Sequence, residues 1–211
     1  MKKNAREKIV DSAVYLFNTK GYSGTSIRDI AAKARVNAAN IAYYFNNKNG
    51  LLEYCLTVYF ENYLKELEKG YSSLEEGAYV CLEAIVDSLT AYQCKNLQLT
   101  RFVLREMTID SQMAREIMAT YMAKERYYLK KVLEAGMNAG EFASQSVPYT
   151  ILQLKSLLGM PFLNADYVKE VLHILPHESY FAEKYSRQVS SWLKAFLSPD
   201  RKHNIREAVS L

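Results

Sequence analysis

The sequence predicts an all-α protein, and three observations lead to that prediction. Only 8 glycines and 4 prolines occur in 211 residues, so few chain reversals interrupt the segments between them. Apolar residues recur three and four positions apart along most of the chain, which is the period of an amphipathic helix. Polar residues that favour helix N-termini stand where the first apolar stripes begin. We therefore expect a small N-terminal three-helix domain followed by a larger helical bundle.

Two helices are expected before residue 35. One is expected over residues 4–19, where the apolar side chains share one face of a helix and Gly21 follows as a stop signal. Those side chains are Ile9, Ala13, Leu16 and Phe17. Thr25 or Ser26 caps a second helix that extends to residue 34, and Asp29 lies in its first turn, where the helix dipole favours an acid.

A third short helix follows after a break of only a few residues. Asn37 is a good cap for a helix over 38–44, and a polar turn over 46–50 separates it from a longer helix over 51–69. The apolar side of that longer helix carries Leu52, Cys55, Leu56, Tyr59, Phe60 and Tyr63. This pattern divides the chain into a domain at 1–50, a helical domain at 51–198 and a tail at 199–211.

The second domain reads as one helix after another beyond a linker at 70–73. Pro161 and Pro176 are expected to break helices, whereas Pro148 fits the first turn of one. The expected helices lie at 74–94, 97–108, 111–138, 147–159, 164–175 and 178–197.

Charge is unevenly spread along the chain. Residues 1–50 carry nine Lys and Arg against three Asp and Glu, and the rest of the chain is mildly acidic. A basic block on an acidic body suggests a polyanion partner for the block alone. A solvated helix face with spare lysines would give the same count, so charge alone leaves both interpretations open.

The second and third helices have the spacing of a helix-turn-helix motif. In that motif the later helix lies in the major groove of DNA, and its first turns meet base edges. Asn40 suits a bidentate contact with adenine, and the hydroxyls of Tyr43 and Tyr44 can donate to phosphates. Ala38 and Ala39 are small enough to let the helix approach the DNA closely. The pattern therefore favours DNA binding, although a small helical bundle with buried tyrosines would share it.

Further DNA contacts are expected beside this helix. Lys48 stands just before the fourth helix, where an ammonium group and helix N-terminal amides can hold a phosphate together. Residues at the start of the second helix are placed for contacts to the DNA backbone. The full set of candidate DNA-binding residues is Thr25, Ser26, Arg28, Asn37, Ala38, Ala39, Asn40, Tyr43, Tyr44 and Lys48.

A run of spaced residues in this region carries a family resemblance. It consists of Gly21-Tyr22, 25–31, 34–37, 41–45, Lys48 and Leu51-Leu52. The run resembles the N-terminal signature of TetR-family transcriptional regulators. Ala39 and Ala42 stand where that family usually has a glycine and a tyrosine, so base preference cannot be carried over from the family.

The resemblance implies an all-α homodimer joined by its last two long helices, here 147–159 and 178–197. A two-fold dimer would prefer a near-palindromic site in double-stranded DNA. The residues then expected at the dimer interface are Leu152, Leu154, Leu157, Leu158, Val189, Trp192, Leu193 and Phe196. The alternative is that they fill the core of one subunit, and we expect a mixture of the two roles.

The resemblance also raises the question of a small-molecule ligand in the second domain. That domain is rich in side chains that can line a cavity but that more often form plain core. They are Tyr79, Tyr92, Phe102, Met107, Met118, Tyr121, Met122, Tyr127, Tyr128 and Met137. A ligand-responsive transcriptional repressor of a metabolic or efflux operon is therefore an alternative function.

Other stretches carry a second resemblance over most of the chain. They are 99–103, 105–111, 151–158 and 176–181. These stretches resemble the RefZ group of TetR-like proteins in spore-forming Bacillaceae, which affect placement of the FtsZ division ring. The resemblance implies regulation of cell division, linked to sporulation, by a protein bound to chromosomal sites, with FtsZ as a partner.

Charged residues in the second domain are the candidates for contacting such a protein partner. Arg101 and Arg105 share a helix face, and Arg115 and Glu116 open the next helix. Salt bridges within the chain would use the same residues, so the charges alone do not decide between the two roles.

The sequence speaks against several other classes of protein. No catalytic residue, metal site or cofactor is expected, because Pro176 breaks the chain between His173 and His177 and no Gly-rich phosphate loop is present. Cys55, Cys81 and Cys94 form no C-x-x-C pair, which is typical of a reduced, cytosolic protein. Without a signal-peptide or membrane-spanning pattern, we expect a cytoplasmic, nucleoid-associated protein.

Overall fold

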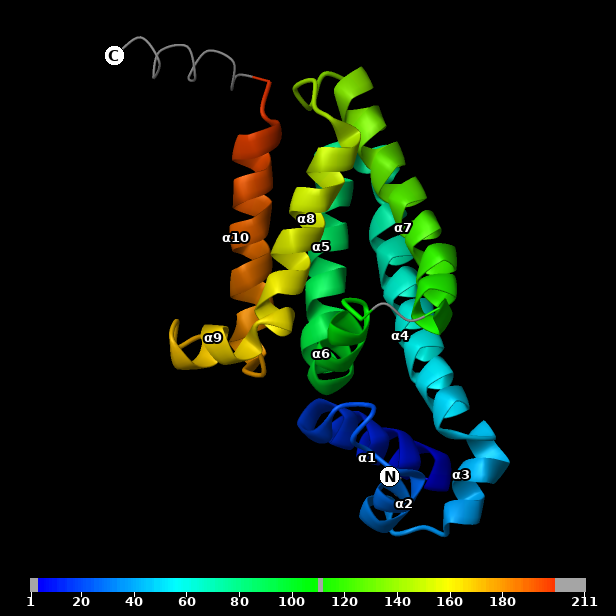
Figure 1. The fold of residues 1–211 in the computed structure, drawn as a ribbon. Coiled ribbons are helices and arrows are strands. Elements are labelled where there is room, and N and C mark those ends of the chain that lie inside the picture. The colour runs from blue at the N-terminus through cyan, green and yellow to red at the C-terminus, as the bar shows by residue number, and fades with distance from the viewer. Residues whose placement is uncertain (1–3, 110–111, 200–211) are drawn as a thin grey trace. The chain divides into compact units, whose positions relative to one another are not determined.

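The structure is a computed structural model, and it describes residues 4–109 and 112–199. Every regular element among these residues is a helix, which confirms the predicted fold class (Figure 1). The predicted tail lies outside the described residues, apart from Pro199. The described residues form two compact units, one within the ranges 1–62 and 96–120 and the other within 63–95 and 121–211.

The first unit contains the three N-terminal helices and more of the chain than the sequence predicted. Its helices are α1 (Ala5–Lys20), α2 (Ile27–Ala34), α3 (Ala38–Phe45), α6 (Leu97–Glu106), and the first parts of α4 (Lys48–Tyr71) and α7 (Gln112–Asn138). Phe17 of α1 stacks on Phe102 of α6 with ring centroids 5.1 Å apart, and both side chains are fully buried.

Arg105 explains why α6 joins this unit. Its guanidinium donates to the carbonyl oxygens of Phe17 and Asn18, at 2.5 Å and 3.3 Å, in the last turn of α1. Helix ends leave carbonyls without intrahelical partners, and a cation there also meets the negative end of the helix dipole. The first unit therefore extends beyond the boundary at residue 50 that the sequence suggested. It includes the first part of α4 and, later in the chain, α6.

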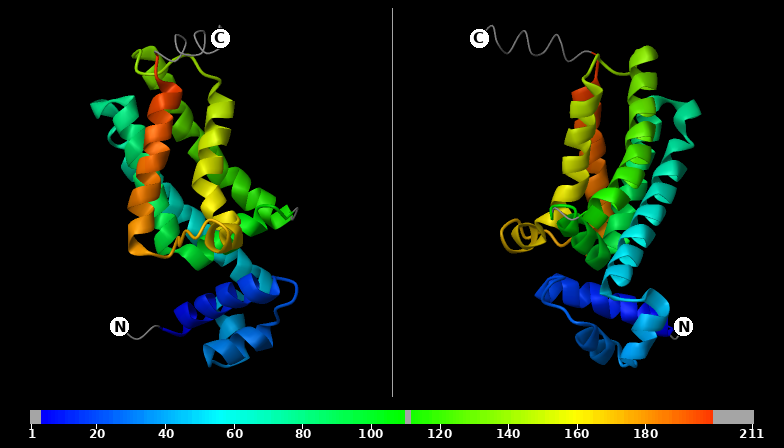
Figure 2. Two further views of the ribbon diagram at one scale, coloured as in Figure 1. Left: turned by 90° about the vertical axis from the view of Figure 1, so that its left-hand side faces the viewer. Right: turned by 45° about the vertical axis from the view of Figure 1, so that its right-hand side comes forward.

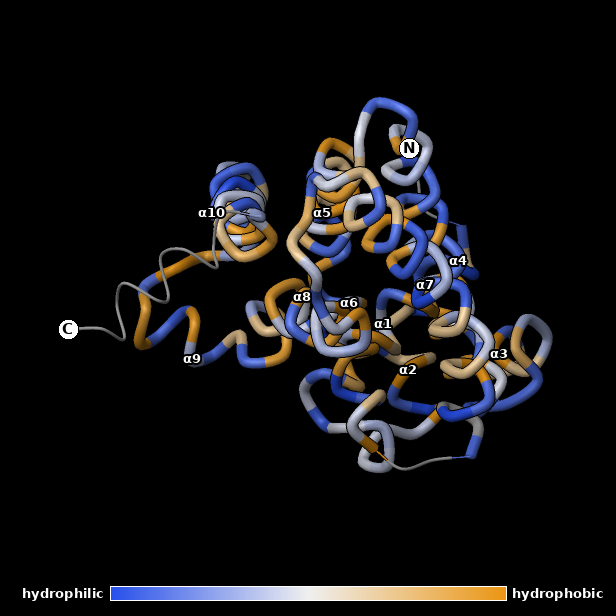
Figure 3. Tube along the Cα trace, turned by 90° about the horizontal axis from the view of Figure 1, so that it is seen from above, coloured by the Kyte–Doolittle hydropathy of each residue, from blue (hydrophilic) through white to orange (hydrophobic). Residues whose placement is uncertain are grey.

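The second unit is built around α5 (Ala78–Lys95). Helix α10 (Ser179–Leu197) packs along α5, and α8 (Val147–Leu163) packs against it as well. Figure 2 shows these helices from two further directions. The short helices η1 (Leu74–Glu76) and α9 (Ala165–Glu170) and the later parts of α4 and α7 complete the unit. In Figure 3, α10 carries hydrophobic and hydrophilic residues on different sides, as expected for a helix with one buried face.

Helix α4 extends beyond its predicted bounds at both ends. Its C-terminal part runs through Gly70, which the sequence suggested as the start of a linker. A Cβ atom added to Gly70 would lie 2.7 Å from the Cα atom of Ile85 in α5. This glycine therefore allows two helix backbones to approach closely rather than ending a helix.

Helix α8 continues through Pro161, where the sequence predicted a break. A proline inside a helix has no N–H group, so the carbonyl of the residue four positions earlier loses its partner. That residue is Leu157, and its carbonyl accepts a 2.7 Å hydrogen bond from the hydroxyl of Tyr185 in α10. The tyrosine thus satisfies the group that Pro161 leaves open.

Replacing Tyr185 with phenylalanine is expected to destabilise the fold by about 1–3 kcal/mol, because the Leu157 carbonyl then loses its donor. The penalty is expected to shrink in a Pro161→Ala background, where the restored N–H can bond to Leu157. Urea unfolding of the four proteins in this double-mutant cycle measures the coupling. Equal penalties in both backgrounds would show that Tyr185 acts independently of the proline.

Candidate nucleic-acid interface

Helices α2 and α3 are held in a tight helix-turn-helix arrangement by their caps. Arg35 ends α2 in the left-handed conformation, with φ of 56°, and its backbone N–H donates to the carbonyls of Ala31 and Ala32. The side chain of Asn37 accepts a 2.8 Å hydrogen bond from the backbone N–H of Ala39 and so caps α3. The sequence predicted this cap, and it fixes the direction in which α3 leaves the turn.

Helix α3 has one buried side and one exposed side. Ile41 and Phe45, four residues apart, are buried and anchor the helix. Tyr43 is 83% exposed and Tyr44 is 40% exposed, with their rings in an edge contact at 5.1 Å between centroids. Three alanines and Asn37 are also exposed, whereas Asn40 is half-buried. The exposed alanines are Ala38, Ala39 and Ala42.

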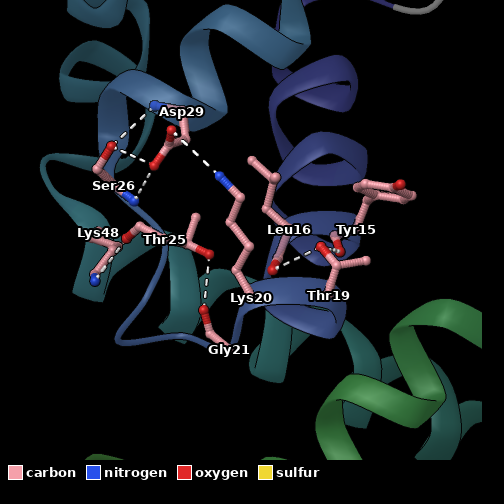
Figure 4. Close-up of polar contacts among 9 residues, drawn as sticks. All are labelled: Tyr15, Leu16, Thr19, Lys20, Gly21, Thr25, Ser26, Asp29 and Lys48. Carbon is pink, nitrogen blue, oxygen red and sulfur yellow. Dashed lines mark hydrogen bonds and ion pairs between the residues drawn. The ribbon is translucent and has the colours of Figure 1, made fainter.

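The first turn of α2 is closed by a capping box (Figure 4). The hydroxyl of Ser26 accepts from the Asp29 backbone N–H at 3.1 Å, and the Asp29 carboxylate accepts from the Ser26 backbone N–H at 3.0 Å. The Ser26 hydroxyl also donates to this carboxylate at 2.7 Å, and Lys20 lies 3.7 Å from it. These hydrogen bonds with Ser26, followed by the charge of Lys20, lower the pKa of Asp29. The sequence left Thr25 and Ser26 as alternatives for the cap, and the structure selects Ser26.

Replacing Ser26 with alanine is expected to cost about 1 kcal/mol of stability near neutral pH, because α2 loses its cap. Because the pKa of Asp29 is lower in the folded state than in the unfolded state, its carboxylate stabilises the fold at pH values above the unfolded-state pKa. This contribution is lost as the pH falls through the folded-state pKa. The difference in stability between the unaltered protein and Ser26→Ala should therefore become smaller below about pH 4. Thermal unfolding at several pH values measures it, and a difference that stays constant into acid would exclude this role for Asp29.

Thr25 and Lys48 occupy different positions from those that the sequence suggested. The Thr25 side chain is buried, and its hydroxyl donates to the carbonyl of Gly21 at 2.8 Å. Lys48 is the first residue of α4, and its ammonium donates at 3.0 Å to the carbonyl of Thr25 (Figure 4). It donates at the same distance to the carbonyl of Tyr22. Both side chains therefore hold the turn between α1 and α2, and the predicted phosphate contacts do not follow from their placement.

Arg6 supports the base of α3, a role that the sequence did not reveal. Its guanidinium lies 4.3 Å from the ring centroid of Tyr54 and 5.8 Å from that of Phe45. A guanidinium over aromatic faces is held by the negative potential of the rings. Arg28, another of the predicted DNA-binding residues, is exposed on α2.

The predicted dimer residues divide into two sets in the second unit. One set is buried within the single chain and consists of Leu154, Leu158, Val189 and Leu193. The other set reaches the surface: Leu152 is 62% exposed, Trp192 is 39% exposed, and Leu157 and Phe196 also keep part of their surface open. Trp192 and Phe196 stack with their ring centroids 4.7 Å apart. Tyr149, which the sequence analysis missed, is 70% exposed near the start of α8.

The four charged residues that are candidates for contacting a protein partner differ in their exposure and in their contacts within the chain. Arg105 is engaged with the end of α1, so it serves the fold of the first unit. Arg101 is half-buried, whereas Arg115 and Glu116 are exposed on α7. Glu116 accepts a 2.9 Å hydrogen bond from Gln112 in the preceding turn.

None of the described helices is long and apolar enough to span a membrane. The described side chains of His, Cys, Asp and Glu form no group of three or more that could hold a metal ion.

Comparison with known proteins places this arrangement in a family. Residues 9–55 match the family described as "Bacterial regulatory proteins, tetR family". The chain is 45% identical over 196 residues to the "Probable HTH-type transcriptional regulator YttP" of Bacillus subtilis, covering 92% of this chain and 95% of that protein. A shorter match, 31% identical over 71 residues, relates it to the biofilm operon negative regulator IcaR of Staphylococcus epidermidis, covering 32% of this chain and 38% of that protein.

Solved structures share the fold over nearly the whole chain. The TetR-family regulator PfmR of Thermus thermophilus superposes with a TM-score of 0.73 at 19% identity, covering 88% of this chain and 96% of that one. The regulator FadR of Bacillus subtilis, solved in complex with stearoyl-CoA, gives 0.67 at 18% identity, covering 90% of this chain and 98% of that one. With the helix-turn-helix arrangement, the family match and the full-length relative in agreement, the chain belongs to the TetR family and is a DNA-binding transcriptional regulator.

Proposed function

We propose that this regulator reads its DNA site through the exposed side of α3, inserted in the major groove. The observation that carries the proposal is Tyr43, 83% exposed on a short helix whose opposite side is anchored by buried Ile41 and Phe45. An aromatic side chain left in water on a rigid helix is available to contact thymine methyl groups or phosphates. Asn40 and the small residues Ala38 and Ala39 lie one turn earlier on the same helix.

A homodimer is part of the same proposal. Leu152 of α8 and Trp192 of α10 are large apolar side chains that a single chain leaves exposed. Apolar side chains of this kind on two long helices favour burial against a second copy. Two copies of α3 would then meet a near-palindromic DNA site.

We further propose that the protein regulates cell division from its chromosomal sites, with FtsZ as the partner. The support is the resemblance of residues 99–103, 105–111, 151–158 and 176–181 to the RefZ group. Arg115 and Glu116 are exposed in the first unit and remain candidates for the partner surface. Replacing Arg115 should impair the effect on division and spare DNA binding.

A ligand-responsive repressor is the second candidate function, and a cavity in the second unit favours it. The cavity has a volume of about 490 Å³ and lies between α7 and α8. FadR, which shares the fold, was solved with stearoyl-CoA bound. A ligand that binds the DNA-free form more tightly would release the protein from its promoter.

Genome-wide mapping of bound sites separates the two candidates. A few sites distributed by chromosome position would support the role in division, whereas sites clustered at promoters would support a repressor. Purified protein should bind such a site with an affinity that falls steeply as salt rises, because phosphate contacts release counterions. Binding that is independent of salt would contradict DNA recognition by the basic residues 1–50.

A further inference from the structure

A cavity between α7 and α8 has the size of a small-molecule site. Its volume is about 490 Å³, within the range of about 300–1,000 Å³ that is typical of ligand pockets. All of its lining residues belong to the second unit. From α7 they are Met122, Glu125, Arg126 and Lys130, and from α8 they are Val147, Pro148, Ile151 and Lys155. Of the aromatic and methionine residues that the sequence suggested for a cavity, only Met122 lines this one.

One part of the lining is a polar cluster around the buried carboxylate of Glu125. The ammonium of Lys155 donates to both carboxylate oxygens of Glu125, at 2.7 Å and 2.9 Å, and the hydroxyl of Tyr63 donates to the same carboxylate at 2.7 Å. The Glu125 side chain is only 3% exposed, so these partners replace its water shell. The charge of Glu125 is therefore balanced within the protein and is not available to attract a cationic ligand.

The remaining charges in the lining are positive. Arg126 and Lys130 lie one turn apart on α7, and both are exposed. Lys130 also lies 3.5 Å from Glu134. A guanidinium such as that of Arg126 matches the two oxygens of a carboxylate or phosphate group in geometry as well as in charge. This end of the cavity therefore suits an anionic group.

The rest of the lining is apolar. Met122 lines the cavity from α7, and Val147, Pro148 and Ile151 line it from α8. Burying the body of a ligand against these side chains contributes about 0.8 kcal/mol per methylene group. Methionine adapts its shape to irregular ligands better than branched side chains do.

We propose that this cavity binds a small organic anion with an apolar body. Its negatively charged group lies at Arg126 and Lys130, and its apolar body lies against Met122, Val147, Pro148 and Ile151. The Glu125–Lys155 pair stays intact and forms the polar part of the lining. The inference deepens the second candidate function by naming the class of ligand, and it rests on that candidate for any consequence on DNA.

Calorimetric titration of the full-length protein with three ten-carbon probes tests the charge preference. Decanoate should bind at least about tenfold more tightly than decanol, because only the carboxylate can pair with the guanidinium. Decyltrimethylammonium should bind more weakly than decanol. Equal binding of decanoate and decanol, tighter binding of the cation, or no binding of decanoate would each overturn the proposal.

Two variants and a control test whether decanoate binds in this cavity. Arg126→Gln should weaken decanoate by about tenfold and leave decanol unchanged. Ile151→Gln should weaken both probes, because it puts an amide on the apolar wall. Lys124→Gln removes a positive charge from an exposed position on α7 outside the lining and should change neither. Equal losses in Arg126→Gln and Lys124→Gln would show that decanoate responds to overall charge only.

DNA binding measured in parallel keeps this inference distinct from the proposed function. If decanoate binds as expected and DNA affinity is unchanged, the ligand site stands and ligand-responsive repression fails. If the protein holds its DNA site and decanoate does not bind, the inference about the cavity fails and DNA recognition stands.

Discussion

Replacing Tyr43 with alanine is expected to lower the affinity for the native DNA site by about 100-fold. A good base contact is worth about 1–3 kcal/mol, and a dimer would lose two of them. Tyr43 is 83% exposed, so its loss should change the free energy of unfolding by less than about 0.5 kcal/mol. The edge contact with Tyr44 is lost as well, which would loosen the second exposed ring. Fluorescence anisotropy with a labelled duplex measures the affinity.

Tyr127→Ala is a matched control for this variant. Tyr127 is 56% exposed, and it lies on α7 in the second unit. The control should keep the DNA affinity and the oligomeric state of the unaltered protein. If Tyr43→Ala bound the native site as tightly as this control, α3 would not be the reading helix.

Replacing Lys155 with methionine is expected to destabilise the second unit by about 3–5 kcal/mol at neutral pH, because an uncompensated buried charge is far more costly than a lost surface ion pair. The change leaves the carboxylate of Glu125 buried, with the hydroxyl of Tyr63 as its remaining partner in the cluster. Because the Lys155 side chain is 31% exposed, water can enter beside it, and the lower end of the range applies. Guanidinium chloride unfolding measures the effect.

The double variant Glu125→Leu with Lys155→Met isolates the cause of that loss. Replacing a buried ion pair by apolar side chains of similar size is often close to neutral, because both desolvation costs disappear. We therefore expect the double variant to be more stable than Lys155→Met alone. A double variant as unstable as the single one would show that Lys155 contributes packing rather than charge compensation.

Local signals in the sequence were sufficient to predict most of the helices and several of their ends. Gly21 ends α1 with a positive φ of 77°, and Asn37 caps α3. Pro148 lies in the first turn of α8. Each of these depends on the chemistry of residues within one helical turn, which is the range over which sequence patterns are informative.

The structure differs from the sequence-based predictions where a residue far away in the sequence compensates for a residue that usually ends a helix. Pro161 reads as a helix break, and α8 continues because Tyr185 of α10 supplies the missing hydrogen bond. Gly70 reads as a linker, and α4 continues because Ile85 of α5 requires a residue without a side chain there. Neither partner can be identified from the sequence around the residue itself.

In the candidate DNA-binding site, features that depend on nearby residues could likewise be predicted, whereas contacts with residues distant in the sequence could not. The exposed aromatic side of α3 follows from its own spacing, since Ile41 and Phe45 fall on the opposite side. The placement of Lys48 could not be predicted, because it depends on carbonyls of Tyr22 and Thr25 in a turn far earlier in the chain. The role of Arg105 could not be predicted either, because its partners are the carbonyls of Phe17 and Asn18 at the end of α1.

The central claim is that α3 reads base edges in the major groove. The most direct measurement replaces single adenines of a mapped site with 7-deazaadenine, which lacks the N7 acceptor that an asparagine amide contacts. We predict that at least one such replacement weakens the unaltered protein by about tenfold or more and has no further effect on the Asn40→Ala variant. If every replacement weakens both proteins equally, or weakens neither, then Asn40 of α3 does not read adenine and the account is contradicted.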